Sequence, residues 1–265
     1  QVLPKDNEDV RSEMLRRPGK EIKRAFVARP GYVLYEFDFS QVEVRVLAHL
    51  SGDEKLIADL KSGMDIHRKM ASSIFGVAFD KVTDQQRSNS KSAVFGIIYG
   101  MSYKTLAEQK GMTESDAKKV YDSFFSAYPG VTRWIEGTKQ FARDHKYVVS
   151  PFNRIRHLDA IDHPRQKLRS KCERCAVNSP IQATGADIPN LAINCVLDEF
   201  KAPEWDFRLI MQVHDAGYFE IREDQEKELA PKIKYTLENT WPLIVPTPVE
   251  AKRGYNLGDV EKVKF

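Results

Sequence analysis

Apolar and polar positions alternate along this chain in two different patterns, one typical of strands and one typical of helices. Residues 32–37 read Tyr-Val-Leu-Tyr-Glu-Phe, an aromatic and apolar run that predicts a buried β-strand. Much later, the apolar stretches 207–213 and 218–221 flank the polar break His214-Asp215-Ala216-Gly217. That pattern predicts a β-hairpin with an acid at its tip.

Between these strands, apolar residues recur every three to four positions, which is typical of helices. We expect a short strand at 147–149 and helices at about 41–49, 54–61, 65–75, 84–98, 113–128, 131–145, 166–178, 182–200 and 224–240. Ser40, with Glu43 three residues later, matches a capping box at the first helix. Pro189 predicts a kink or an interruption in the helix at 182–200.

The order of these elements predicts the fold class. Strands near both ends of the chain, with a long helical stretch between them, indicate an α+β fold in which a small antiparallel sheet with packed helices carries a mostly helical insertion. With 265 residues and 42% hydrophobic content, the chain is long enough for one large domain or two interlocked ones. No apolar run approaches the roughly 18 residues of a membrane span, so we expect no membrane partner.

Cysteine and charge content add two observations. Three cysteines are too few for a disulfide framework, which fits a reducing compartment, and the pair Cys172 and Cys175 has no second pair at zinc-finger spacing. The net charge is only +3, but five basic residues between Arg165 and Arg174 oppose one acid, Glu173. Such a run could neutralise phosphates, although by itself it favours a solvated helix face.

Two acids stand at the ends of predicted core strands. Asp38 follows the strand at 32–37, and Asp215 lies at the hairpin tip. If sheet pairing brings them together, their carboxylates form an oxygen-rich site for Mg²⁺, and a pair of such ions can clamp the attacking and leaving oxygens of a phosphoryl displacement. Taken singly, either acid is explained as well by a turn or a helix cap.

A second pattern lies on the predicted helix at 84–98. Arg87, Lys91, Phe95 and Tyr99 follow one another at intervals of four residues, and they form one stripe with two cations first and two aromatic rings after them. That order suits a nucleoside triphosphate, with its phosphates on the cations and its sugar and base near the rings. An amphipathic helix with a charged first half explains the spacing equally well.

Taken together, these blocks resemble the family A (polymerase I type) DNA polymerases. The run from Asp38 to Asp53 resembles motif A, the stripe from Arg87 to Gly100 resembles motif B, and Gln212-Val213-His214-Asp215 resembles motif C. Two further blocks are similar to family segments that contact phosphate and DNA: Asp65-Ile66-His67-Arg68, and the block from Arg174 to Asp187. Several long motifs in family order are far more specific than any single match.

The resemblance implies a role for each matching residue. Asp38, Asp215 and the backbone carbonyl of Phe39 are implied to hold two Mg²⁺ ions, and Arg87, Lys91 and His67 to hold the triphosphate, with Lys91 also catalytic. The implied contacts to the rest of the incoming nucleotide come from Gln41, Glu43, Phe95 and Tyr99, with Glu43 excluding a ribose 2′-OH. The implied contacts to primer or template come from Arg174, Asn178, Gln182 and His214.

The resemblance also implies an organisation and partners. Residues 1–53 and 166–265 are expected to form the palm, and residues 54–165 the fingers, with the motif B helix at about 84–98. Gln1-x-x-Pro4 resembles the end of the segment that leads into the palm, so we expect a covalent or separate thumb and exonuclease portion. The expected partners are primer–template DNA and dNTPs, in a bacterial cytoplasm or a phage-infected cell.

Some residues depart from the family pattern. Ala216 and Gly217 follow Asp215 where the family usually has a second acid, and Pro151 and Asn153 replace residues more typical of the family. Two other functions compete with DNA synthesis: RNA synthesis by a single-subunit polymerase, and a non-catalytic DNA-binding module. Glu43 and Phe95 argue against the first, and the intact Asp38, Asp215, Arg87 and Lys91 argue against the second.

Overall fold

The computed structural model describes residues 19–110 and 113–265. The predicted lead-in segment at Gln1 to Pro4 lies outside the described residues. The described chain divides into two compact units, each assembled from separate stretches of sequence. The borders of these units differ from the predicted domains 1–53, 54–165 and 166–265, so the names palm and fingers remain predictions.

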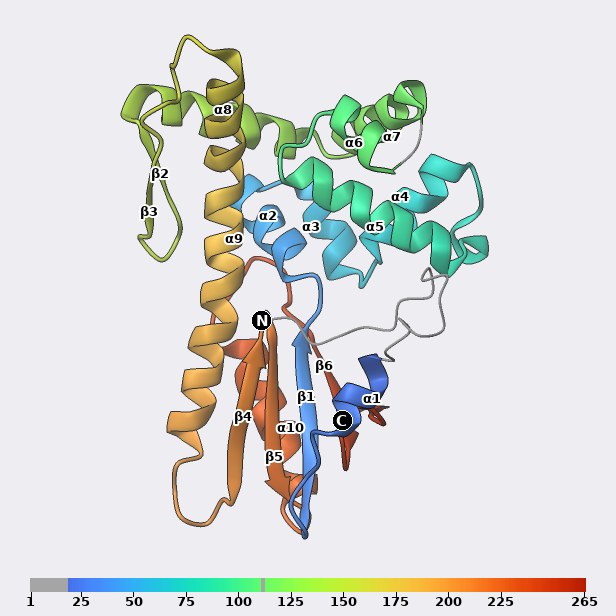
Figure 1. The fold of residues 1–265 in the computed structure, drawn as a ribbon, viewed down its shortest axis with the longest axis vertical. Coiled ribbons are helices and arrows are strands. Elements are labelled where there is room, and N and C mark those ends of the chain that lie inside the picture. Colours follow the sequence, from blue (N-terminus) through green and yellow to red (C-terminus); the bar gives the residue numbers. More distant parts are fainter. Residues whose placement is uncertain (1–18, 111–112) are drawn as a thin grey trace. The chain divides into compact units, whose positions relative to one another are not determined.

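The first unit contains a five-stranded antiparallel sheet. It comprises the described residues up to Val42 together with Gly185–Pro242 and Thr247–Phe265. The strand order is β4-β5-β1-β6-β7, of which Figure 1 labels the first four. The strands are β1 (Tyr32–Phe39), β4 (Phe207–Val213), β5 (Ala216–Arg222), β6 (Val249–Gly254) and β7 (Glu261–Val263). The predicted strand and hairpin are confirmed, as is the α+β fold class, whereas β6 and β7 were not predicted.

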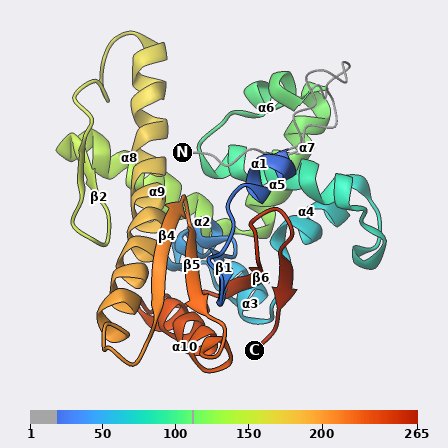
Figure 2. The same cartoon turned by 60° about the horizontal axis from the view of Figure 1, so that its bottom comes forward.

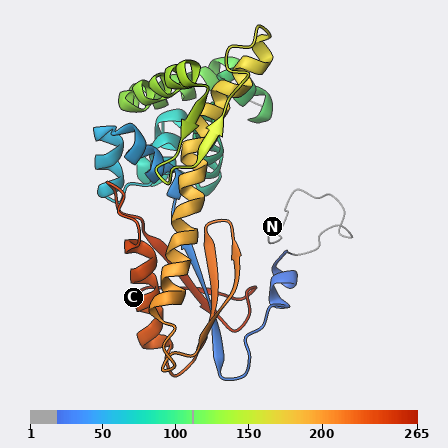
Figure 3. The ribbon, with the colours of Figure 1, turned by 90° about the vertical axis from the view of Figure 1, so that its left-hand side faces the viewer.

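Helices cover one face of this sheet. Figure 3 shows α10 (Glu226–Asn239) and the later part of α9 (Gln166–Glu199) on the same side of the strands. The packing is close at Gly217 of β5, where an added Cβ would lie 2.9 Å from Phe219 Cε2 and 3.2 Å from Ile193 Cδ1. Because Phe37 and Phe219 are fully buried on this face, alternation places Asp38 and Glu36 on the opposite face.

The second unit is mostly helical. It comprises Glu43–Thr184 and the short stretch Leu243–Pro246, which is held by hydrogen bonds from Arg45 Nη1 to the Pro246 carbonyl oxygen (2.7 Å) and from Ile244 N to His49 Nδ1 (3.2 Å). Its elements, several of which are labelled in Figure 2, are α2 (Val42–Ser51), α3 (Glu54–Lys61), α4 (Ile66–Phe75), a 3₁₀ turn η2 (Phe79–Lys81), α5 (Asp84–Ile98), α6 (Tyr103–Lys110), α7 (Glu114–Ala127), α8 (Pro129–His145), β2 (Tyr147–Val149), β3 (Ile155–His157) and the first part of α9. A short helix α1 (Gly19–Arg24) belongs to the first unit.

Side-chain caps explain why several predicted helix starts are correct. Asp53, Asp65 and Thr113 are the N-caps of α3, α4 and α7, and each accepts a hydrogen bond from a backbone N–H in the first turn of its helix. These caps satisfy donors that the helix itself leaves unpaired.

The predicted interruption at Pro189 is wrong, as is the division into helices at 166–178 and 182–200, whereas the alternative of a kink stays a prediction. Helix α9 is continuous over 34 residues and passes through both Pro180 and Pro189. Each proline removes one backbone hydrogen bond, but the residues around them are buried, with Ile181 at 0% and Ile188 at 1% exposure. Packing of these buried neighbours therefore holds the helix together at both prolines. No helix in the described part of the chain is long and apolar enough to cross a membrane.

Candidate active site

Asp38 and Asp215 come together at one end of the sheet in the first unit. Asp38 pairs with Ala216 across β1 and β5, and the backbone N of Phe39 donates to the carbonyl oxygen of Asp215 at 3.4 Å. Asp215 stands in the two-residue turn of the β4–β5 hairpin, where His214 has a φ of 55°. Pairing of β1 with the hairpin thus joins two carboxylates that are 177 positions apart.

The electrostatics of this end of the sheet are unfavourable to two bare carboxylates. Burial, and then repulsion from Asp215 and Glu36, raise the pKa of Asp38 to about 6, with Lys252 acting in the opposite direction. Burial and the same three carboxylates also raise the pKa of Tyr218. Lys252 is itself paired with another carboxylate, since its Nζ lies 2.5 Å from Glu36 Oε1.

The two carboxylates are suited to a shared cation bound through additional oxygens. Among the described residues, neither Asp38 nor Asp215 forms an ion pair, and no three His, Cys, Asp or Glu side chains are grouped to hold a metal by themselves. Mg²⁺ is usually held by one or two carboxylates and keeps several waters. The donor set here, two carboxylates with backbone carbonyls beside them, fits that ion.

Gln41 lies in the turn between β1 and α2, immediately after these residues. Its φ of 53° is left-handed, and its buried Oε1 atom has no hydrogen-bond partner. Non-glycine residues in this conformation cost energy and cluster at functional sites. The predicted nucleotide-binding residue Gln41 is therefore held in a conformation that its local sequence does not favour.

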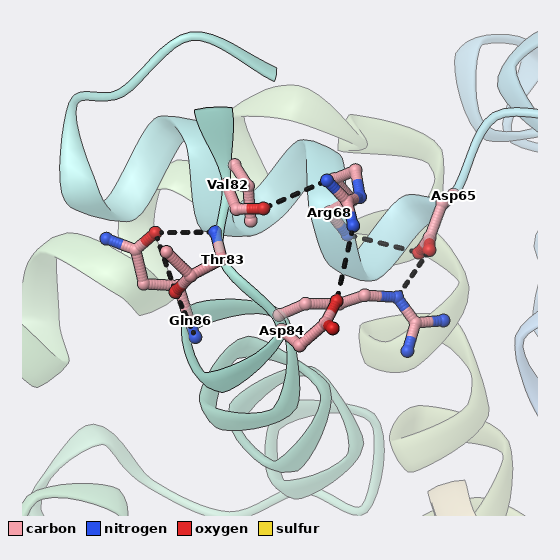
Figure 4. A network of polar contacts seen from close by, with 7 residues as sticks. Asp65, Arg68, Val82, Thr83, Asp84 and Gln86 are labelled. Carbon is pink, nitrogen blue, oxygen red and sulfur yellow. Dashed lines mark hydrogen bonds and ion pairs between the residues drawn. The ribbon is translucent and has the colours of Figure 1, made fainter. Parts of the chain in front are cut away.

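The second unit holds the predicted phosphate-binding side chains around α4 and α5. Arg87 Nε donates to Asp65 Oδ2 at 2.5 Å, while the other oxygen of Asp65 caps α4 by accepting from Arg68 N at 3.1 Å. Arg68 in turn binds the Val82 carbonyl oxygen (2.9 Å) and Asp84 (3.5 Å), and Figure 4 shows how this network ties α4 to the start of α5. Arg87 is thus positioned from α4.

His67 lies in the same neighbourhood but is fully buried. Burial is the main cause that lowers the pKa of His67 to about 4, and the charges of Lys91 and Arg87 add to it, while Asp65 acts in the opposite direction. The imidazole is therefore neutral at pH 7. Lys91 is exposed one turn after Arg87 on α5, so the structure brings together all three side chains that were predicted to hold a triphosphate.

The end of α5 joins two further predicted residues. The hydroxyl of Tyr99 donates to the carboxylate of Glu43, in the first turn of α2. The carbonyl oxygen of Tyr99 accepts from Asn178 Nδ2 on α9 at 2.9 Å. Phe95 lies on α5, but its side chain is outside the described part of the structure. Glu43, Tyr99 and Asn178 therefore form one connected group.

The remaining predicted DNA contacts lie on exposed surfaces. Arg174 and Gln182 are exposed on α9 and His214 at the hairpin tip, whereas Asn178 is half-buried. Arg174 also lies against Gly100, where an added Cβ would come within 3.1 Å of the Arg174 Cγ atom. A cavity of about 800 Å³ opens beside Tyr99, Gly100 and Arg174, and it is bounded further by Tyr121 and Phe125 of α7.

Sequence reasoning missed two residues that shape these groups. Asp65 was quoted only as part of a motif, and neither its cap position nor its basic neighbours reveal the ion pair with Arg87, 22 positions away. Glu36 could have been found, because it lies two residues before Asp38 on the same face of a strand. Cys172 and Cys175 pack against an apolar cluster that includes Ala142, Val148 and Ala176.

The chain is similar in sequence to known DNA polymerases. The chain is 39% identical to DNA polymerase I of Caldicellulosiruptor bescii over 238 residues, and 39% identical to the thermostable DNA polymerase I of Thermus thermophilus over 236 residues. These alignments cover 90% and 89% of this chain, and in both cases the chain spans 28% of the relative's length. The chain is thus similar to a limited portion of each relative.

A solved structure shows the same fold. The POL domain of Pol1 from M. smegmatis, in complex with DNA primer–template and dNTP, matches with a TM-score of 0.85 and 33% identity, over 96% of this chain and 44% of that one. The sequence profile of the family described as DNA polymerase family A matches residues 7–259. The resemblance of the motifs is thereby confirmed, and the chain belongs to DNA polymerase family A.

Proposed function

We propose that this chain carries the catalytic part of a template-directed DNA polymerase, which adds dNTPs to a primer 3′-OH by two-metal phosphoryl transfer. The observation that carries the proposal is the convergence of Asp38 and Asp215, since pairing of β1 with the hairpin leaves two carboxylates side by side without a cation partner among the described residues. Membership of DNA polymerase family A supports it.

Asp38 and Asp215, with the backbone carbonyl of Phe39, are the residues that would hold Mg²⁺. When bound, the ions would supply charge for the attacking and leaving oxygens of the displacement. The chain's own contribution is to hold the two carboxylates on adjacent, rigid strands. Ala216, which is buried opposite Asp38, contributes no carboxylate there, so Asp215 is the only acid that this turn supplies.

Arg87, Lys91 and His67 are proposed to bind the triphosphate. Asp65 fixes Arg87 through Nε alone, and none of the described residues hydrogen-bonds the two terminal nitrogens, which leaves a forked donor pair for phosphate oxygens. Lys91, an exposed cation one turn further on, is proposed to offset charge as pyrophosphate leaves. His67, buried and neutral, would donate only after becoming accessible.

Selection of the nucleotide is proposed to rest on the group around Tyr99. The hydrogen bond from the Tyr99 hydroxyl anchors the carboxylate of Glu43, so that it acts as a fixed barrier against a ribose 2′-OH. Gln41 and Phe95 are proposed to contact the same nucleotide, with Phe95 packing on its sugar. Arg174, Asn178, Gln182 and His214 are the proposed contacts to primer and template, and palm and fingers are the proposed names for the sheet unit and the helical unit.

The partners proposed with this activity are primer–template DNA and dNTPs, together with a thumb and exonuclease portion, covalent or separate. The Pol1 structure from M. smegmatis that matches this fold is a complex with DNA primer–template and dNTP. A bacterial cytoplasm, or that of a phage-infected cell, is the proposed location, supported by the bacterial origin of the relatives.

Primer extension by the whole natural protein tests this proposal. With Mg²⁺, we expect extension with dNTPs and little with rNTPs, and we expect Asp38→Asn and Asp215→Asn to lower the rate at least about a hundredfold while DNA binding survives. Preferred use of rNTPs would identify an RNA polymerase instead. Binding without extension by the unmutated protein would identify a DNA-binding module, and variant rates within about tenfold of the unmutated rate would remove both acids from catalysis.

A further inference from the structure

Two lysines extend the row of proposed DNA contacts along α9. Lys167 and Lys171 precede Arg174, Asn178 and Gln182 at intervals of four, three, four and four residues. In a helix of 3.6 residues per turn, these five positions share one face. Four of them are exposed and Asn178 is half-buried. We call this set the α9 stripe.

The cations of the α9 stripe are not neutralised by the protein. Among the described residues, no carboxylate forms an ion pair with Lys167, Lys171 or Arg174. The one acid of the run, Glu173, points to another side of the helix and binds Arg143 of α8 at 2.8 Å. Positive charge therefore remains exposed along one face of α9.

Several lysines on three other helices are paired instead. Lysines on α7, α8 and α10 pair with acids three or four residues away, as in Lys118–Asp122, Lys119–Asp116, Lys139–Glu136, Lys232–Glu228 and Lys234–Glu238. Such interspersed pairs are typical of an ordinary solvated face. The absence of such pairs from the α9 stripe, within the described chain, is what distinguishes a phosphate-binding surface from that ordinary case.

The position of Arg174 gives the stripe a direction. Arg174 packs against Gly100, directly after Tyr99, the residue proposed to lie beside the nascent base pair. Asn178 and Gln182 lie on the C-terminal side of Arg174 along α9, and Lys171 and Lys167 lie on its N-terminal side. DNA synthesis leaves duplex on one side of the nascent base pair and uncopied template on the other. Because Asn178 and Gln182 are the proposed contacts to the primer–template duplex, the two lysines lie on the opposite side of Arg174, toward the uncopied template.

We infer that Lys167 and Lys171 bind the sugar–phosphate backbone of the uncopied, single-stranded template ahead of the nascent base pair; this rests on the proposed function. From Lys167 to Arg174, seven residues of helix span about 10 Å, which is roughly three steps of a strand stacked as in the duplex, at about 3.4 Å per step, and fewer if the strand is extended. Because these lysines contact phosphates and not bases, we expect binding without sequence preference. The contacts extend over the first few nucleotides of the template overhang.

The test measures binding of the whole natural protein to primer–template DNA by fluorescence anisotropy, with 5′ template overhangs of zero to eight nucleotides, over a range of salt concentrations. For the unmutated protein, we expect affinity to rise with overhang length up to about four nucleotides. In Lys167→Ala/Lys171→Ala, we expect that gain to vanish and the salt dependence on long overhangs, log Kd against log salt, to fall by about 1.4.

The matched control is Lys118→Ala/Lys119→Ala, which removes the same two charges from α7 of the same unit, where both lysines are paired with acids. We expect this variant to keep the gain from the overhang. Equal losses in the two variants, or an unchanged gain in Lys167→Ala/Lys171→Ala, would overturn the inference. If the unmutated protein binds no primer–template of any kind, the proposed function itself fails.

Discussion

The sheet unit and the helical unit handle charge in opposite ways. At the end of the sheet, Asp38 and Asp215 lie together, neither is in an ion pair with a described residue, and burial followed by their mutual repulsion raises the pKa of Asp38 to about 6. In the helical unit, Arg87 is paired with Asp65 through one nitrogen. The sheet therefore holds an acid pair that an external cation would stabilise, while the helices hold a cation that is oriented but still has free donors.

This difference shows how each site is made rigid. Strand pairing fixes the two acids through the backbone, so no side-chain partner is needed to bring them together. Helix α5 presents a long, flexible arginine, and its orientation depends on one carboxylate that also caps α4. Perturbing the acid pair should therefore change the affinity for a cation, whereas perturbing Asp65 should change the geometry of a donor.

In the helical unit, the strongest predicted dependence on pH belongs to the buried His67. Its pKa of about 4 in the folded protein lies below the ordinary 6.5, so the unfolded chain takes up a proton first as the pH falls. Above pH 6.5, His67 is neutral in both the folded and the unfolded chain and does not lower the free energy of unfolding. As the pH falls from 6.5 toward 4, protonation of the unfolded chain lowers that free energy by up to about 3 kcal/mol.

Urea unfolding of the unmutated protein and of His67→Gln at pH 7 and pH 4.5 measures this effect. From pH 7 to pH 4.5, the free energy of unfolding should fall more in the unmutated protein than in His67→Gln, because glutamine does not titrate. Parallel losses of stability in both proteins over this range would show that His67 does not titrate as an isolated buried group.

A second prediction concerns Glu43 and its hydrogen bond from Tyr99. Glu43→Ala should raise the use of rNTPs relative to dNTPs by roughly 10- to 100-fold, because the barrier to the 2′-OH is removed. The measurement is the ratio of kcat/KM values for the two nucleotides. Tyr99→Phe, which keeps the carboxylate but removes the hydrogen bond that anchors it, should raise the ratio less than Glu43→Ala does.

For Glu43, an unchanged ratio with about 1 kcal/mol lower stability would favour its other interpretation, a helix-capping residue. The two roles are distinguishable because capping affects unfolding and the barrier affects only the choice of sugar.

A third prediction, with a more modest effect, concerns the ion pair between Asp65 and Arg87. Asp65→Ser keeps an N-cap oxygen for α4 but loses the carboxylate that holds the guanidinium. We expect the KM for dNTP to rise about tenfold with little change in melting temperature, as befits one charge-assisted hydrogen bond. In an Arg87→Ala background, the same substitution should add nothing to KM. Additive effects in the double variant would mean that Asp65 does not act through Arg87.

Local signals in the sequence predicted most of the helical unit. The caps Asp65 and Thr113 mark the starts of α4 and α7, since a capping side chain acts within three residues. The continuity of α9 through Pro189 could not be predicted, because it depends on burial against distant residues. Strand β6 was missed for a similar reason: Val249–Gly254 is short and charged, and its pairing with β1 defines it as a strand.

The candidate site divides in the same way. Residue types at motif spacing identified Asp38, Asp215, Arg87 and Lys91. The contacts that raise the pKa of Asp38 and orient Arg87 come from tertiary structure and could not be predicted from that spacing. Asn153 illustrates a departure that structure explains: its φ of 59° is left-handed, a conformation that asparagine tolerates better than most residues. The burial of His67 is the feature that its motif least suggested.

The most direct test of the central claim, that Asp38 and Asp215 form a cation site, is the stability of the unmutated protein and of Asp38→Asn at pH 8, with EDTA and with Mg²⁺. The raised pKa of Asp38 means that its charge lowers the stability of the folded protein above about pH 6. Without metal, we therefore expect Asp38→Asn to be more stable by about 1–3 kcal/mol. Adding Mg²⁺ should raise the melting temperature of the unmutated protein and leave the variant nearly unchanged; equal Mg²⁺ shifts in both proteins would contradict the account.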